Sequence, residues 1–198
     1  MKRFSLLLFI FIISFLTACS LKNNDDTAVT IDSANLSTFE QNLLDLIGEY
    51  TSVVELQIND NDAEIIEVSI DQYKNGEKQE EVMLFTSYLD DTDLSKPIRV
   101  LISKQTNHKD IEWLASIISD GGTTSMESKT PFEKEYTGSA FGMANMPTSI
   151  HLGEKKVIGT VALTDSDSVH IRSDIESEED LKEATDYEEV YIINLMVK

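Results

Sequence analysis

The chain has 198 residues, of which 36 are acidic and 16 are basic, so its formal net charge at pH 7 is −20. A domain this acidic is repelled by phosphate backbones and by anionic lipid headgroups, which argues against nucleic acid as a partner. The single cysteine, Cys19, excludes an intramolecular disulfide and a thiolate metal cluster.

The first residues have the organisation of an export signal. Lys2 and Arg3 precede the apolar run 4–16, which is interrupted only by two serines. A basic start followed by such a run is typical of a secretory signal peptide. The run is shorter than the ~20 apolar residues that a membrane-spanning helix needs. The alternatives are a plain signal peptide or a short buried helix, in which Cys19 has no special role.

The tetrapeptide Leu16-Thr17-Ala18-Cys19 resembles the lipobox of bacterial lipoproteins. The resemblance implies cleavage before Cys19, attachment of diacylglycerol to its thiol and, often, acylation of the new amino terminus by a fatty acid such as palmitate. It also implies an outward-facing position on a bacterial cell membrane or envelope. Two or three acyl chains anchor a protein stably, whereas a single chain binds a membrane only marginally.

Three segments are expected along the chain. They are a lipoprotein signal peptide over 1–18, a flexible acidic tether over 19–33, and a single β-rich globular domain over 34–198. Removal of the signal peptide takes away two basic residues and no acids, so the mature charge becomes −22. The remaining length of about 180 residues fits one domain with a sizeable core.

A helix is predicted near the start of the domain. Ser37 and Glu40 have capping-box spacing, and Gly48 provides a stop signal, so the helix should cover about 37–48. We expect its apolar stripe to pack into the core rather than to form a groove for a partner. The stripe consists of Leu36, Phe39, Leu43, Ile47 and Tyr50.

A β-hairpin is predicted around Asn75-Gly76, which separates two alternating runs and suits a type I′ turn. The apolar residues of both strands then fall largely on one side. On the other side two acids face each other, either as hydrated carboxylates, which we favour, or as ligands of a cation. The register pairs Lys74 with Glu77, Ile66 with Phe85, Val68 with Met83, and Asp71 with Glu80.

Further strands are predicted at 51–58, 97–105, 110–119 and 155–165, and a second short helix is predicted over 177–184. The segment 110–119 also fits a helical period, but its β-branched residues and the turn signal after it favour a strand. The last run, 190–198, is apolar on both faces apart from Asn194, which is typical of a central strand. Together these elements indicate a mainly β fold. We expect an antiparallel β-sandwich or jelly-roll-like domain with one or two short helices.

No catalytic signature is present in the sequence. His108, His151 and His170 lack a metal-ligand spacing, and we interpret them as ordinary surface or turn residues. The stretch around Ser139 misses the G-x-S-x-G spacing of a serine nucleophile by one residue. A pair of carboxylates for glycoside hydrolysis is available in principle, because the acids are numerous.

Three acidic clusters are weak candidates for Ca²⁺, a cation that requires six to eight oxygen ligands. Each cluster lies between predicted strands, where Asp and Asn commonly form turns, and we favour that interpretation. None of them completes an EF-hand loop. The candidate ligands are Asp60, Asp62, Asp90, Asp93, Asp165 and Asp167.

The sequence therefore predicts a lipid-anchored envelope protein that acts as a non-catalytic binding or interaction module, with Ca²⁺ as an optional cofactor. Apart from the membrane, the expected partners are an envelope protein, a peptide or a glycan. The alternative is a surface glycan hydrolase that uses an Asp/Glu pair. A cleft with two carboxylates ~5–10 Å apart, one of them buried beside aromatic rings, would favour the hydrolase.

Overall fold

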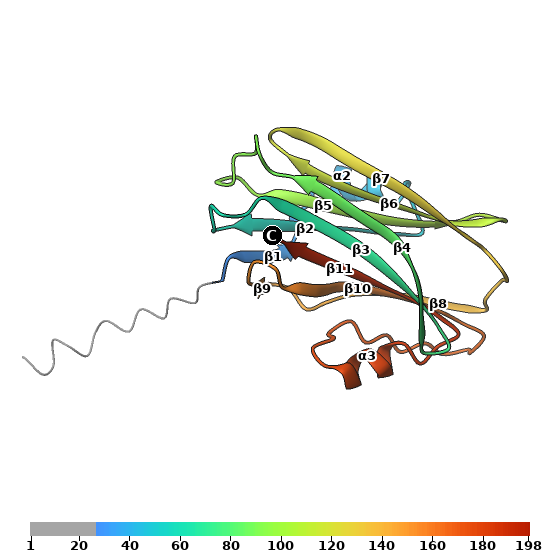
Figure 1. The fold of residues 1–198 in the computed structure, drawn as a ribbon. Helices are drawn as coiled ribbons and strands as arrows, with labels where there is room; N and C mark the ends of the chain where they lie inside the picture. Colours follow the sequence, from blue (N-terminus) through green and yellow to red (C-terminus); the bar gives the residue numbers. More distant parts are fainter. Residues whose placement is uncertain (1–26) are drawn as a thin grey trace, which may run out of the picture.

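Two antiparallel sheets pack face to face, with two short helices on the outside, in the computed structural model, which describes residues 27–198 (Figure 1). Sheet A has the strand order β7-β6-β5-β2-β1-β9, and sheet B has the order β4-β3-β11-β10-β8. The predicted antiparallel β-sandwich with two short helices is thereby confirmed. The elements are β1 (Val29–Ser33), α2 (Thr38–Leu44), β2 (Tyr50–Ile58), β3 (Ile65–Lys74), β4 (Glu77–Tyr88), β5 (Ile98–Thr106), β6 (Asp110–Ser119), β7 (Gly122–Pro131), β8 (Gly138–Met143), β9 (Thr148–Ile150), β10 (Lys155–Thr164), α3 (Glu178–Ala184) and β11 (Glu189–Val197).

The main core fills the space between the sheets and follows the alternation of the strands. Trp113 of β6 and Tyr191 of β11 meet across it, with ring centroids 5.1 Å apart. β11 lies between β3 and β10, as predicted for a central strand. Its second face is also buried, because Val190 and Ile192 belong to a smaller apolar cluster on the outer side of sheet B. This double burial explains why the strand is apolar on both faces.

The boundary between tether and domain was placed too late in the sequence. Residues 29–33 form β1, which pairs with both β2 and β9, and Val29 and Ile31 are completely buried. The two apolar side chains are too few to stand out from their polar surroundings in the sequence. Strands on both sides supply the partners that stabilise this short segment. The predicted signal peptide, Cys19 and the first part of the tether lie outside the described residues.

The hairpin turn was predicted correctly, but the register beyond it was not. Asn75 and Gly76 have φ angles of 50° and 81°, as a type I′ turn requires. Two bulges then shift the pairing of β3 and β4 by two residues, so that Phe85 lies opposite Val68 instead of Ile66. A shift of two residues preserves the alternation, and the apolar side chains therefore still face the core.

The predicted partner of Asp71 is wrong by one residue, although the residue opposite it is still an acid. Asp71 pairs with Glu81 in the ladder, and its carboxylate forms ion pairs with Lys78 at 3.0 Å and Lys155 at 3.4 Å. The ammonium groups of Lys78 and Lys155 therefore balance the charge of Asp71, for which the sequence left hydration or a bound cation as the alternatives.

Both helices begin at the predicted caps. Ser37 and Glu40 form the reciprocal capping box of α2, and the Ser177 hydroxyl accepts a hydrogen bond from the Asp180 amide at the start of α3. α2 ends at Leu44, earlier than predicted, and continues as a turn toward Gly48. Within residues 27–198, no helix has the length and apolar composition needed to cross a bilayer.

Candidate functional site

A cleft of about 310 Å³ opens at the end of the sandwich where β2 begins and β5 ends. The loop 132–137, which crosses from sheet A to sheet B, forms one wall of the cleft. Three aromatic rings and several polar side chains share its surface. The lining consists of Glu49, Tyr50, Lys104, Thr106, Phe132, Tyr136, Ser139 and Leu163.

Lys104 is the most unusual residue of this cleft, because only 2% of it is exposed. Its Nζ donates hydrogen bonds to Glu49 Oε2 at 2.8 Å and Thr106 Oγ1 at 2.6 Å, and it lies 5.4 Å from the ring centroid of Tyr50. A buried ammonium group is costly unless it is paired in this way. Burial alone raises the pKa of Glu49, but its contacts with Lys104 and Thr106 together lower it below the ordinary value.

Gly48 allows this arrangement by letting the chain pass close to β5. A Cβ atom at this position would lie 2.3 Å from Ser103 Oγ and 2.7 Å from the Lys104 carbonyl oxygen. Gly48 therefore lets the segment between α2 and β2 lie closer to β5 than a residue with a side chain would allow. The close approach brings Glu49 to Lys104.

Ser139, which the sequence singled out and rejected as a nucleophile, lies on β8 at the cleft. Its Oγ is 2.6 Å from the hydroxyl oxygen of Tyr50, whose ring packs against Phe141. The serine thus lies on a strand, beside a tyrosine hydroxyl, rather than on a strained elbow beside a base. This geometry suits hydrogen bonding to a ligand and does not suit nucleophilic attack.

A buried carboxylate lies behind the loop wall. Glu189 is 4% exposed and accepts hydrogen bonds from the hydroxyls of Tyr136 and Tyr191 and from the side-chain amide of Gln72. Burial and the neighbouring Glu189 charge raise the pKa of both tyrosine hydroxyls above their ordinary value. Tyr136 therefore stays a hydrogen-bond donor and fixes the loop to the core.

Both buried charges could have been found from the alternation of their strands. Lys104 has the same parity as Ile98, Val100 and Ile102, and Glu189 has the same parity as Tyr191 and Ile193. The periodicity places both side chains between the sheets. Nothing in the sequence indicates that they lie at the same end of the sandwich, because 85 residues separate them.

A second unusual feature is the outer face of α2. The prediction that its apolar stripe packs into the core is wrong for Phe39, Leu43 and Ile47, which are 70%, 45% and 40% exposed, whereas Tyr50 does pack against the core. Leu46, which the predicted stripe did not include, is 83% exposed. Within the helix, Leu44 is the buried residue. The helix is held from its other side, where Glu40 contacts Arg99 of β5. An amphipathic pattern shows that one face is apolar but does not show whether that face is covered.

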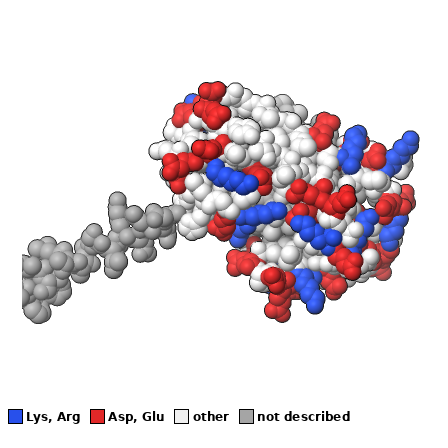
Figure 2. Space-filling view, in the orientation of Figure 1, with Lys and Arg blue, Asp and Glu red and all other residues white. Residues whose placement is uncertain are grey.

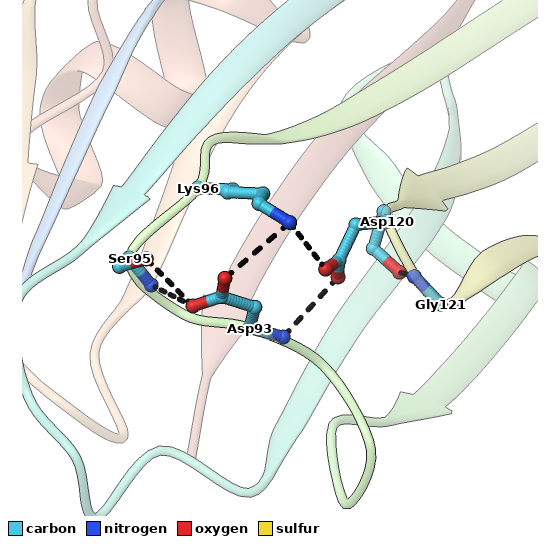
Figure 3. A network of polar contacts seen from close by, with 6 residues as sticks. Asp93, Ser95, Lys96, Asp120 and Gly121 are labelled. Carbon is cyan, nitrogen blue, oxygen red and sulfur yellow. Dashed lines mark hydrogen bonds and ion pairs between the residues drawn. The ribbon is translucent and has the colours of Figure 1, made fainter.

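The candidate Ca²⁺ ligand Asp93 belongs to a polar network in the loop between β4 and β5 (Figure 3). Its carboxylate accepts hydrogen bonds from the amide and hydroxyl of Ser95, and Lys96 bridges it to Asp120. The Ser95 hydrogen bonds lower the pKa of Asp93, and the contact with Lys96 lowers that of Asp120. Ser95 and Lys96 thus occupy carboxylate oxygens that a cation would need.

The other candidate ligands are also turn residues. Asp60 accepts a hydrogen bond from the Asp62 amide, and Asp165 forms an ion pair with Lys134 at 2.7 Å. Asp90 and Asp167 are exposed in other turns. Among the described residues, the structure brings together no group of three or more His, Cys, Asp or Glu side chains that could hold a metal ion.

The three histidines lie in separate connecting segments. His108 lies in the turn between β5 and β6, His151 directly follows β9, and His170 lies between β10 and α3. The His170 amide donates to the Tyr187 hydroxyl, which in turn donates to the His170 carbonyl oxygen. This pair of contacts fixes the backbone of the segment and does not involve the imidazole ring.

Comparison with protein families matches residues 30–197 to the YgaN domain. The matched range includes β1 and ends with β11, so it coincides with the whole sandwich. Neither the curated proteins nor the solved structures gave a match to this chain.

Proposed function

The chain belongs to the YgaN domain family, and we propose that this member is a lipid-anchored module of the bacterial envelope that binds a hydroxyl-rich ligand, such as a cell-wall glycan, in the end cleft. The proposed role is binding without catalysis. The observation that carries it is the combination of aromatic and polar side chains in one open cleft.

The chemistry of the cleft suits a sugar unit. Tyr50, Phe132 and Tyr136 contribute aromatic rings with little conformational freedom to lose, and such rings suit contact with a pyranose. The ammonium groups of Lys104 and Lys134 lie over the rings of Tyr50 and Tyr136 and cover part of them. Ser139 and Tyr50 offer hydroxyls that can donate or accept hydrogen bonds, and Glu49 offers carboxylate oxygens. The buried Lys104 holds Glu49 in place, so the cleft is pre-organised.

Hydrolysis has less support from this geometry. A general acid must carry a proton near the working pH, but the contacts of Glu49 with Lys104 and Thr106 hold its pKa below the ordinary value. Glu189 is buried beside aromatic rings, as expected for one member of a hydrolytic pair, but three donors enclose its oxygens. The lowered pKa of Glu49 keeps it ionised, and burial keeps Glu189 away from a ligand in the cleft, so neither suits the role of a catalytic acid.

The anchor rests on the lipobox resemblance and has a direct test. The Cys19→Ala variant should lose lipid labelling and leave the membrane fraction, because the thiol is the proposed attachment point. A variant that still partitions into detergent would contradict the anchor, while leaving the binding proposal open to its own test.

Ligand binding can be measured by titrating the lipoprotein in detergent with enzymatically solubilised peptidoglycan. Tyr50→Phe and Ser139→Ala each remove one hydroxyl from the cleft, and we expect each to weaken binding about tenfold. Tyr88→Phe is the matched control, because Tyr88 is 70% exposed on β4 and does not line the cleft. Equal affinity in all three variants would refute the cleft as the binding site.

A further inference from the structure

We propose that the outer face of α2 contacts the lipid surface and thereby orients the anchored domain on the membrane. The contact surface, here called the α2 stripe, consists of Phe39, Leu43, Leu46 and Ile47. The inference rests on the proposed lipid anchor and adds a second, non-covalent contact at a different site from the end cleft.

The α2 stripe is the largest concentration of exposed apolar side chains in the described part of the chain. It contributes four of the seven large hydrophobic residues that are exposed there, and the remaining three belong to β4 and β7. Phe39 and Leu43 are one turn apart on α2, and Leu46 and Ile47 lie in the turn that directly follows the helix. Contiguous exposed apolar surface of this kind marks a site of contact with a protein or a membrane.

The helix cannot easily turn the α2 stripe inward. The capping box fixes its first turn, Leu44 is buried, and Glu40 reaches Arg99 on the outer face of sheet A. Arg99 also contacts Glu55 of β2, so the helix is tied to two strands. The exposed orientation is therefore built into the fold.

The charge around the α2 stripe favours a membrane of zwitterionic lipids. Acidic side chains are spread over the face of the domain in Figure 2, with lysines and arginines between them. On α2, Glu40 shares Arg99 with Glu55, and Asp45 at the C-cap accepts a hydrogen bond from Gln41, so acidic side chains flank the α2 stripe as well. The stripe itself carries no charge, so it meets a neutral headgroup layer with little electrostatic penalty.

The length of chain between anchor and domain keeps the α2 stripe within reach of the membrane. Ten residue steps separate Cys19 from Val29, and ten residues span at most ~36 Å even when fully extended. Only four residues, 34–37, then connect β1 to α2. A lipid on Cys19 therefore holds this helix near the bilayer at a high local concentration, which makes even a weak apolar contact effective.

The single cysteine of the sequence provides a clean test. Acylation of Cys19 leaves no free thiol, so Leu46→Cys creates one labelling site on the α2 stripe in the full lipoprotein. A nitrobenzoxadiazole label at this position is followed in phosphatidylcholine vesicles that contain doxyl-labelled lipid. Tyr88→Cys provides the matched control, because this residue is similarly exposed but lies on β4 in the opposite sheet.

We expect blue-shifted emission and at least threefold stronger doxyl quenching for the label at 46 than for the label at 88. Combining Phe39→Ser with Leu46→Cys should reduce this difference, because it removes one apolar side chain from the α2 stripe.

Equal quenching at both positions in a chain that floats with the vesicles would refute the helix contact and leave the anchor intact. A chain that fails to float would refute the anchor and, with it, this proposal. A blue shift that grows with protein concentration without lipid would identify a second copy as the occupant and overturn the proposal.

Discussion

The two helices of this protein are similar in sequence design and opposite in packing. Each has seven residues, begins at a serine cap and lies outside a sheet of the sandwich. α3 and the segment before it cover the apolar cluster of Tyr73, Val190 and Ile192 on sheet B. α2 buries Leu44 and exposes its apolar stripe. An amphipathic helix can therefore close a core or remain available for another surface, and only its neighbours decide between the two roles.

The largest difference between the helices should appear when the surface beneath α3 is changed. Ile192 is 2% exposed within the cluster that α3 covers, so Ile192→Ala should lower the free energy of unfolding by about 2–5 kcal/mol. Urea unfolding of the variant and the parent protein measures the change. A loss below about 0.5 kcal/mol would mean that α3 does not close a second core, and the contrast with α2 would disappear.

The helix caps should separate global from local stability. Ser37→Ala and Ser177→Ala each remove a cap worth about 1 kcal/mol. Because α3 packs on a buried cluster, we expect the Ser177 variant to lower the urea midpoint of the whole domain. The Ser37 variant should mainly accelerate amide hydrogen exchange within α2, since little of this helix is buried. Equal effects on the midpoint would indicate that α2 is coupled to the core as tightly as α3.

Acid should weaken both helix ends. Hydrogen bonds from Ser37 and Ser177 lower the pKa values of Glu40 and Asp180 below 4.5 and 3.8, their respective ordinary values. A lowered pKa in the folded state adds stability above the unfolded value, and this stability is lost as the pH falls through the folded value. The thermal midpoint should therefore decrease below about pH 4.5, and Glu40→Gln and Asp180→Asn should each show a smaller decrease than the parent protein between pH 5 and 3.

The smallest effect is expected for the α2 stripe itself. Leu46 is 83% exposed, so Leu46→Ala should change the free energy of unfolding by less than about 0.5 kcal/mol, in contrast to Ile192→Ala. Urea unfolding without lipid gives this value. A loss of more than 1 kcal/mol would show that the stripe is part of the core and would remove the basis for a membrane contact.

Part of the end cleft could be predicted from the sequence, but its assembly could not. The alternation of β5 places Lys104 between the sheets, and the alternation of β11 does the same for Glu189. Tyr50 was assigned to the helix stripe, although it begins β2. Ser139 was considered for a different chemistry. The cleft itself depends on the loop 132–137 crossing between the sheets, which is a long-range feature with no local signal.

The sequence by itself determined the local structure: the extended segments that form the strands, the Asn75-Gly76 turn and the two serine caps. These features depend on contacts between residues close in the chain, so short patterns predict them. The tertiary structure decided that β1 is a strand of sheet A, that two bulges lie between β3 and β4, and that the α2 stripe is exposed. Each of these depends on which distant strand or helix lies alongside, and burial is a property of that neighbour as much as of the residue itself.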